Sequence, residues 1–256
     1  MRSVAVLCDI HGNLPALDAV LAELAADPPD AVVIGGDVVA GPYPREVLER
    51  LDGLPWPSHW VRGNADRCVV AAFDGAIPDA ERDEPMWVAD AWTAERLSVA
   101  ERDRLAVLPA LARLELDGLG PVLFCHGTPR SDEERVTAVT PQERLARILA
   151  GVAEALVVGG HTHRQFDLRA GGRRMLNAGS VGRPYEREPG AYWLRLGPGV
   201  EHRRTTYDTA AATEAFRALG YPDADGMLAP VDPDEVSAFF EAGAARPLDQ
   251  ASLTGR

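Results

Sequence analysis

The chain has 256 residues, carries a net charge of −13 at pH 7 and is 46% hydrophobic. This acidity argues against non-specific binding to nucleic acids or anionic membranes, which need a basic footprint. All 26 basic residues are arginine, which excludes lysine chemistry such as a P-loop or a Schiff base. No apolar run approaches the roughly 20 residues of a membrane span. Together with the odd count of three cysteines, this predicts a cytoplasmic protein.

The first third of the chain alternates strands with helices. Short apolar runs are typical of buried parallel strands, and the segments between them have apolar residues at helical spacing. We expect strands at 3–9, 31–37 and 58–64 and helices at 13–27 and 43–54. Parallel strands end at one edge of a sheet, so Asp9, Asp37 and Asn64 are expected to lie together there.

The rest of the chain predicts a second sheet and more helices. Residues 66–109 read as a helical insertion placed to cover a site. The following segments are expected to be a strand pair at 111–127, a helix at 140–152, a strand at 154–163, hairpins at 165–180 and 191–208, and helices at 209–220 and 232–244 before a loose polar tail.

Polar residues beside glycines follow most of these apolar strands. They are Asp9, His11, Asp37, Asn64, His126, His161 and His163. Taken alone, each is more often a turn or hydrogen-bonded residue than a ligand. Five separate segments share this position, however, so coincidence explains the pattern poorly.

A metal site is the chemistry that best uses these residues. There is no Gly-x-Ser-x-Gly elbow, and Cys8 and Cys125 lie inside strands, so Ser and Cys nucleophiles are disfavoured. Imidazoles with carboxylates suit Mn, Fe, Co, Ni or Zn. Seven ligands are too many for the coordination sphere of one tetrahedral ion. They fit two ions about 3.5–4 Å apart that share a carboxylate and are bridged by a hydroxide, which acts as the nucleophile. Such a centre attracts an anionic phosphate ester.

The ordered motifs D-x-H-G-N, G-D-x-x-x-x-G, G-N-x-D, H-G and G-H-T-H span residues 9–163 and resemble those of the calcineurin-like metallophosphoesterases. NAGSVG at 177–182 is similar to the N-P-G-S-V-G stretch of a small prokaryotic phosphodiesterase branch. The resemblance implies an α/β fold, a four-layer αββα sandwich of two mixed sheets flanked by helices. The expected domain covers 1–207, with 66–109 inserted and 208–256 as a helical extension packed on it.

The resemblance also implies residue roles. Asp9, His11 and His163 would hold one ion and Asn64, His126 and His161 the other, with Asp37 between them. In an extended H-T-H segment both rings face the same way. We expect catalysis from His11, Asp37, Asn64 and His126, with manganese favoured. Asn13 and Arg130 are the expected substrate contacts, Arg130 being chosen among five arginines near the motifs.

The predicted function is hydrolysis of a small phosphodiester or nucleotide-type ester. A phosphomonoesterase or protein phosphatase on the same centre is the first alternative, and a non-catalytic scaffold is the second. Many relatives have histidine after the Gly-Asn pair as a proposed proton donor, whereas this chain has Ala65. The sequence leaves the oligomeric state open.

Overall fold

The computed structural model describes residues 1–78 and 81–244, and within these ranges the chain forms two five-stranded mixed sheets and eight helices. The first sheet has the order β10-β9-β1-β2-β3. Its strands are β1 (Val4–Leu7), β2 (Ala31–Ile34), β3 (Ser58–Trp60), β9 (Ala191–Leu196) and β10 (Val200–Thr205). β1, β2 and β3 are parallel, as the sequence predicts.

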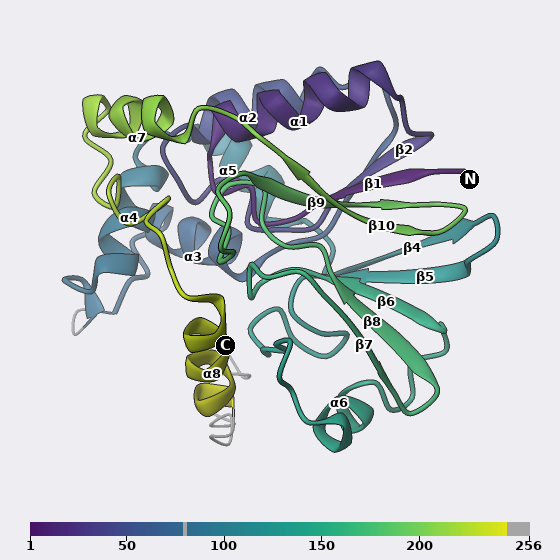
Figure 1. The fold of residues 1–256 in the computed structure, drawn as a ribbon. Helices are drawn as coiled ribbons and strands as arrows, with labels where there is room; N and C mark the ends of the chain where they lie inside the picture. Colours follow the sequence, from purple (N-terminus) through teal and green to yellow (C-terminus); the bar gives the residue numbers. More distant parts are fainter. Residues whose placement is uncertain (79–80, 245–256) are drawn as a thin grey trace.

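Two crossover helices connect these parallel strands. They are α1 (Leu14–Ala26) and α2 (Pro44–Asp52). Asn13 caps α1 by accepting a hydrogen bond from the Ala16 N–H. Leu17 and Val20 of α1 pack with Leu7 of β1 in the core between these helices and the sheet. Both helices cover the outer face of the first sheet (Figure 1).

The second sheet has the order β4-β5-β6-β8-β7. Its strands are β4 (Leu111–Leu116), β5 (Gly120–Cys125), β6 (Leu156–Gly159), β7 (Phe166–Ala170) and β8 (Arg173–Asn177). β5, β6 and β8 are parallel, and β4 and β7 pair antiparallel at the two edges. The short helix α6 (Gln142–Ile148) packs on its outer face through Leu145 and Ile148.

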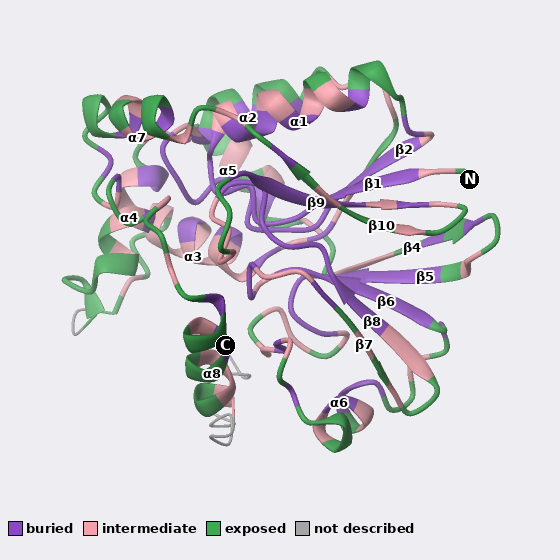
Figure 2. Cartoon of the chain, in the orientation of Figure 1, coloured by how far each residue is buried: buried purple, intermediate pink, exposed green. Residues whose placement is uncertain are grey.

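The two sheets pack face to face around an apolar core. Along β1, Val4 and Val6 enter this core, while Ala5 and Leu7 face the helices. Phe124 of β5 contributes from the second sheet. The central strands β1, β2 and β6 are therefore buried on both faces, whereas the edge strands are partly exposed and the helices are exposed on their outer sides (Figure 2). The predicted four-layer α/β architecture is confirmed.

The hairpin of β9 and β10 corrects one part of the prediction. The sequence suggested that the second half of the chain builds its own sheet, but β9 pairs antiparallel with β1 in the first sheet. β9 is apolar on both sides: Trp193 packs in the helix-side core and Leu194 between the sheets. The free edge of β1 accepts such a strand, and local sequence periodicity does not encode which edge a hairpin joins.

Five helices gather at the carboxyl ends of the parallel strands (Figure 1). They are α3 (Asn64–Phe73), α4 (Pro85–Ala94), α5 (Val99–Ala106), α7 (Thr209–Ala218) and α8 (Pro233–Ala244). The first three form the expected helical segment, which begins at Asn64 rather than at residue 66. The tail predicted to be loose lies outside the described residues. In the described ranges, no helix combines the length and apolar character that a membrane crossing requires.

Candidate metal centre

The chain turns sharply where the strands end. In the described part of the chain, the non-glycine residues with positive φ are Asp9 (55°), His11 (47°), Asp37 (52°), His161 (69°) and His163 (55°). Such left-handed conformations cost about 1–3 kcal/mol each and cluster at functional sites. All of these residues are predicted ligands. The H-T-H segment is thus not extended as expected. Instead, His161 and His163 both have left-handed backbone conformations, which set the directions of their rings.

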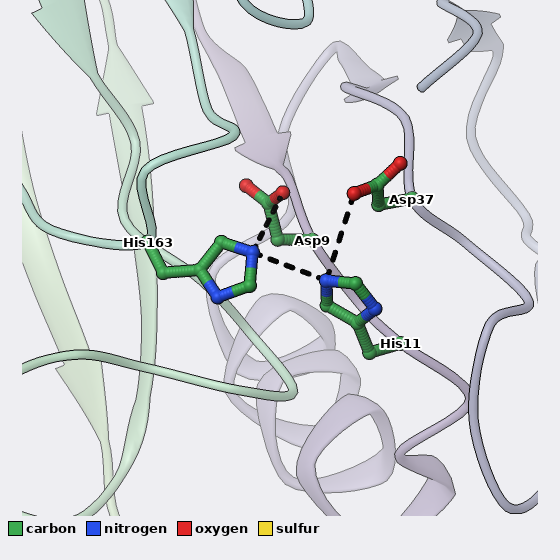
Figure 3. A group of neighbouring side chains, drawn as sticks. All are labelled: Asp9, His11, Asp37 and His163. Atoms are coloured by element: carbon green, nitrogen blue, oxygen red, sulfur yellow. Dashed lines mark hydrogen bonds and ion pairs between the residues drawn. The ribbon is translucent and has the colours of Figure 1, made fainter. Parts of the chain in front are cut away.

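Four buried side chains form the first group, which Figure 3 shows. They are Asp9, His11, Asp37 and His163. His163 Nε2 lies 3.3 Å from Asp9 Oδ1 and 3.1 Å from His11 Nε2. His11 Nε2 lies 3.7 Å from Asp37 Oδ2. One potential ligand atom of each residue therefore lies within 4.8 Å of the others.

The second group consists of Asp37, His126 and His161. His126 Nε2 lies 3.3 Å from Asp37 Oδ2 and 3.1 Å from Asn64 Oδ1. Asn64 is therefore part of the same cluster, as the first residue of α3. Asp37 belongs to both groups, and the structure brings all seven predicted ligands together.

Hydrogen bonds orient the imidazole rings. The Nδ1–H groups of His11, His126 and His163 donate to the carbonyl oxygens of Ala40, Gly35 and Arg183 at 3.1, 2.9 and 2.7 Å. Each bond leaves Nε2 facing the cluster with its lone pair, the arrangement found at histidine metal ligands. His161 differs, because its Nε2 donates to the Glu133 carbonyl at 3.1 Å.

The electrostatics of the cluster suit a cation. Burial opposes ionisation of Asp37, but the neighbouring His126 and His11 hold its pKa far below the usual range. Burial, followed by the charge of a neighbouring histidine, lowers the pKa of both His11 and His161 to about 4. At neutral pH, Asp37 is therefore ionised and His11 and His161 are neutral, as metal binding requires. His126 differs, because despite its burial the carboxylates of Asp37 and Asp9 raise its pKa to about 10, so a bound ion would displace its proton.

Asp66 is a supporting residue to which the sequence interpretation gave no role. Its carboxylate accepts hydrogen bonds from the N–H groups of Asp37 at 2.9 Å, Val38 at 2.8 Å and Gly63 at 3.0 Å. It thereby fixes the loop that carries Asp37. A Cβ at Gly63 would lie only 2.1 Å from Asp37 Oδ1, so this approach needs glycine. The last position of the G-N-x-D motif was the available signal.

A cavity of about 430 Å³ opens over the cluster. Predicted ligands and Ala65 line one side, and Met86, Ala89 and Asp90 of α4 line another. Arg135, Arg183, Tyr185, Tyr221, Asp223 and Phe240 complete the wall. The insertion and the C-terminal helices therefore shape access to the cluster.

The structure places neither predicted substrate residue in this cavity. Asn13 is fully buried, and its Nδ2 donates to the Gly182 carbonyl at 2.8 Å and the Tyr207 hydroxyl at 3.0 Å. Its Oδ1 already caps α1, so it has no atom left for a substrate. Arg130 lines a separate surface hollow and pairs with Glu134. Arg135 and Arg183 are the arginines that line the cavity.

The comparison with protein families fits this geometry. Residues 1–195 match the calcineurin-like phosphoesterase superfamily domain. The chain belongs to this superfamily. It is therefore a phosphoesterase, a hydrolase, whose buried Asp and His groups can hold metal. The superfamily assignment from the motifs is confirmed, while the phosphodiesterase branch stays a prediction.

Solved structures show the same fold. A hypothetical protein from Pyrococcus horikoshii is 23% identical, with a TM-score of 0.77 over 89% of this chain and 98% of its own. A metallophosphoesterase from Sphaerobacter thermophilus is 25% identical, with a TM-score of 0.70 over 89% of this chain and 99% of its own. No curated protein matches the sequence.

Proposed function

We propose that this phosphoesterase hydrolyses phosphodiesters or nucleotide-type phosphate esters at a centre of two divalent transition-metal ions, with manganese favoured. The observation that carries the proposal is the position of Asp37, which belongs to both groups of potential ligands. A carboxylate shared by two nitrogen-rich groups is what a dinuclear site requires.

The two groups of neighbouring potential ligands correspond to the two proposed ions. Asp9, His11 and His163 would hold one ion and Asn64, His126 and His161 the other, with Asp37 shared. When bound, such ions supply Lewis-acid charge and provide hydroxide at neutral pH. The nearby Cys8 and Cys125 stay out of the ligand set, because burial raises the pKa of both thiols. The N and O donors support a metal such as manganese.

The cavity wall supports an ester with a second organic group. Arg183 lies largely buried, and its Nε has no hydrogen-bond partner, while its Nη2 lies 2.7 Å from Asp223. Arg135 provides a second guanidinium in the cavity. Both can bind phosphoryl oxygens. Tyr185, Tyr221 and Phe240 offer aromatic surface beside them, which suits the second substituent of a diester.

Replacing one predicted ligand tests the proposal. We expect His126→Ala to lower both the metal content and the hydrolysis of bis-p-nitrophenyl phosphate, because this ring lies against Asp37 and Asn64. His202→Ala is the matched control, since His202 is an exposed residue of β10 outside the cluster. Full activity in His126→Ala or in metal-stripped protein would contradict the proposal.

The two alternatives have their own tests. Comparing p-nitrophenyl phosphate with bis-p-nitrophenyl phosphate separates a monoesterase from a diesterase, and we expect a higher kcat/KM for the diester. A non-catalytic scaffold would bind no metal at this cluster, so metal analysis of the purified protein addresses it. The retention of all seven predicted ligands in one cluster favours the enzyme.

A further inference from the structure

Ala65 leaves the proposed reaction without the side chain that many relatives place there. Its N–H donates to Asp37 Oδ1 at 2.7 Å, and its methyl group lines the cavity. A methyl group cannot give a proton to a leaving alcohol, although proton transfer by a positioned side chain contributes roughly 10²–10⁴-fold to rate. A proton donor is therefore to be sought in the same cavity.

Three carboxyl groups line this cavity in the described part of the chain: Asp37, Asp90 and Asp223. Asp37 is held between the histidines of the cluster. Asp223 pairs with the Arg183 guanidinium at 2.7 Å. Asp90, by contrast, is only 4% exposed, and its Oδ2 is buried without a hydrogen-bond partner. Leaving a buried polar atom without a hydrogen bond destabilises the fold, so the unpaired Oδ2 of Asp90 calls for a functional explanation.

The surroundings of Asp90 favour the protonated form of its carboxyl group up to about neutral pH. Burial, followed by the negative charges of Asp37 and Asp66, raises its pKa to about 7. The other titratable groups near it are the thiol of Cys68 on α3 and the hydroxyl of Tyr221 after α7. The guanidinium groups of the cavity wall belong to Arg135 and to Arg183, which is already paired.

We propose that Asp90 is the general acid of this phosphoesterase, protonating the leaving oxygen in the role that Ala65 cannot fill. The inference rests on the proposed function. As hydroxide forms the new bond to phosphorus, the bond from phosphorus to the leaving oxygen breaks with its electron pair. The Asp90 carboxyl gives its proton to that oxygen, an alcohol departs, and the carboxylate then takes a proton from water.

The decisive experiment compares two leaving groups in Asp90→Asn. An amide has nearly the shape of the acid but cannot complete the proton transfer. With diphenyl phosphate, whose phenol is a poor leaving group, we expect kcat to fall about 100-fold. With bis-p-nitrophenyl phosphate, whose leaving group departs as an anion, we expect a loss below about fivefold. Glu95→Gln makes the same chemical change at the exposed end of α4 and should lower neither rate.

Two further readouts do not depend on that comparison. Infrared spectra of the metal-free protein at pH 6 should show the carbonyl band of a protonated carboxylic acid that Asp90→Asn lacks. Adding Ala65→His to Asp90→Asn should restore diphenyl phosphate hydrolysis, because position 65 lines the same cavity. Metal content measured on every variant shows whether the centre is intact.

The outcomes separate this inference from the proposed function. An equal loss on both diesters, no loss on diphenyl phosphate, or the absence of the infrared band overturns the role of Asp90 while the phosphodiesterase remains. Failure of the metal-loaded wild type to hydrolyse either diester overturns the proposed function and this inference with it.

Discussion

Replacing Asp66 by alanine tests whether this buried carboxylate holds the loop of Asp37. The substitution removes the acceptor of four buried N–H groups, three at 2.8 to 3.0 Å and that of Val39 at 3.4 Å. Each unpaired buried donor costs about 1–3 kcal/mol, so the three short bonds alone give an expected loss of unfolding free energy of about 3–9 kcal/mol. Domains have only about 5–15 kcal/mol in total. The metal affinity should fall as well, because Asp37 loses its fixed position.

Urea denaturation of the metal-free protein, followed by circular dichroism, measures this loss. Asp18→Ala is the control, because Asp18 forms a solvent-exposed ion pair with Arg50. We expect this control to change the unfolding free energy by less than about 1 kcal/mol. A loss below about 1 kcal/mol in Asp66→Ala would refute the view that the hydrogen bonds to its carboxylate organise the site.

The other predictions concern the cavity and its supports. Gly63→Ala should abolish metal binding in calorimetric titrations, because the new Cβ would lie 2.1 Å from Asp37 Oδ1; wild-type affinity would show that the loop adapts freely. Burial raises the pKa of Asp90 from 3.8 to about 7, so the folded metal-free protein keeps a proton that the unfolded chain releases. Asp90 should therefore contribute a fall of about 4 kcal/mol to the unfolding free energy between pH 4 and pH 8, and Asp90→Asn should lack that contribution in denaturant titrations. Ala65→His should raise the rate for poor leaving groups more in Asp90→Asn than in the wild type, because Asp90 already supplies the proton there; an unaltered preference among aryl diesters in Asp90→Asn would contradict our interpretation of Ala65.

The sequence predicted the part of the site that lies on the strands. Asp9 and Asp37 follow short apolar runs that form parallel strands of the first sheet, whose ends lie at one edge. His126 follows the apolar run of β5, which belongs to the second sheet. The family resemblance then implied how the ligands divide between two ions, and the two groups of neighbouring side chains have the same members, with Asn64 beside His126. Apolar runs over four to six residues were sufficient to predict these strands, because most of their residues are buried.

The residues of the cavity wall could not be predicted in this way. Arg183, Tyr221 and Asp90 line the cavity. They come from segments in which hydrophobic periodicity predicts at most a helix, and it does not predict which residues lie next to that helix in space. Arg130 was favoured for its closeness to His126 in sequence, yet the turn after β5 directs it to Glu134. The pairing of β9 with β1 likewise depends on a free edge that exists only in the assembled sheet.

The number of ions is tested most directly by titrating metal-stripped protein with Mn²⁺ while following hydrolysis of bis-p-nitrophenyl phosphate. Plasma mass spectrometry of the same samples gives the bound metal per chain. We expect no activity in the stripped protein and a maximum when two ions are bound per chain, because Asp37 joins both groups of ligands. Full activity in the stripped protein, or a maximum at one ion per chain, would contradict a dinuclear phosphoesterase centre.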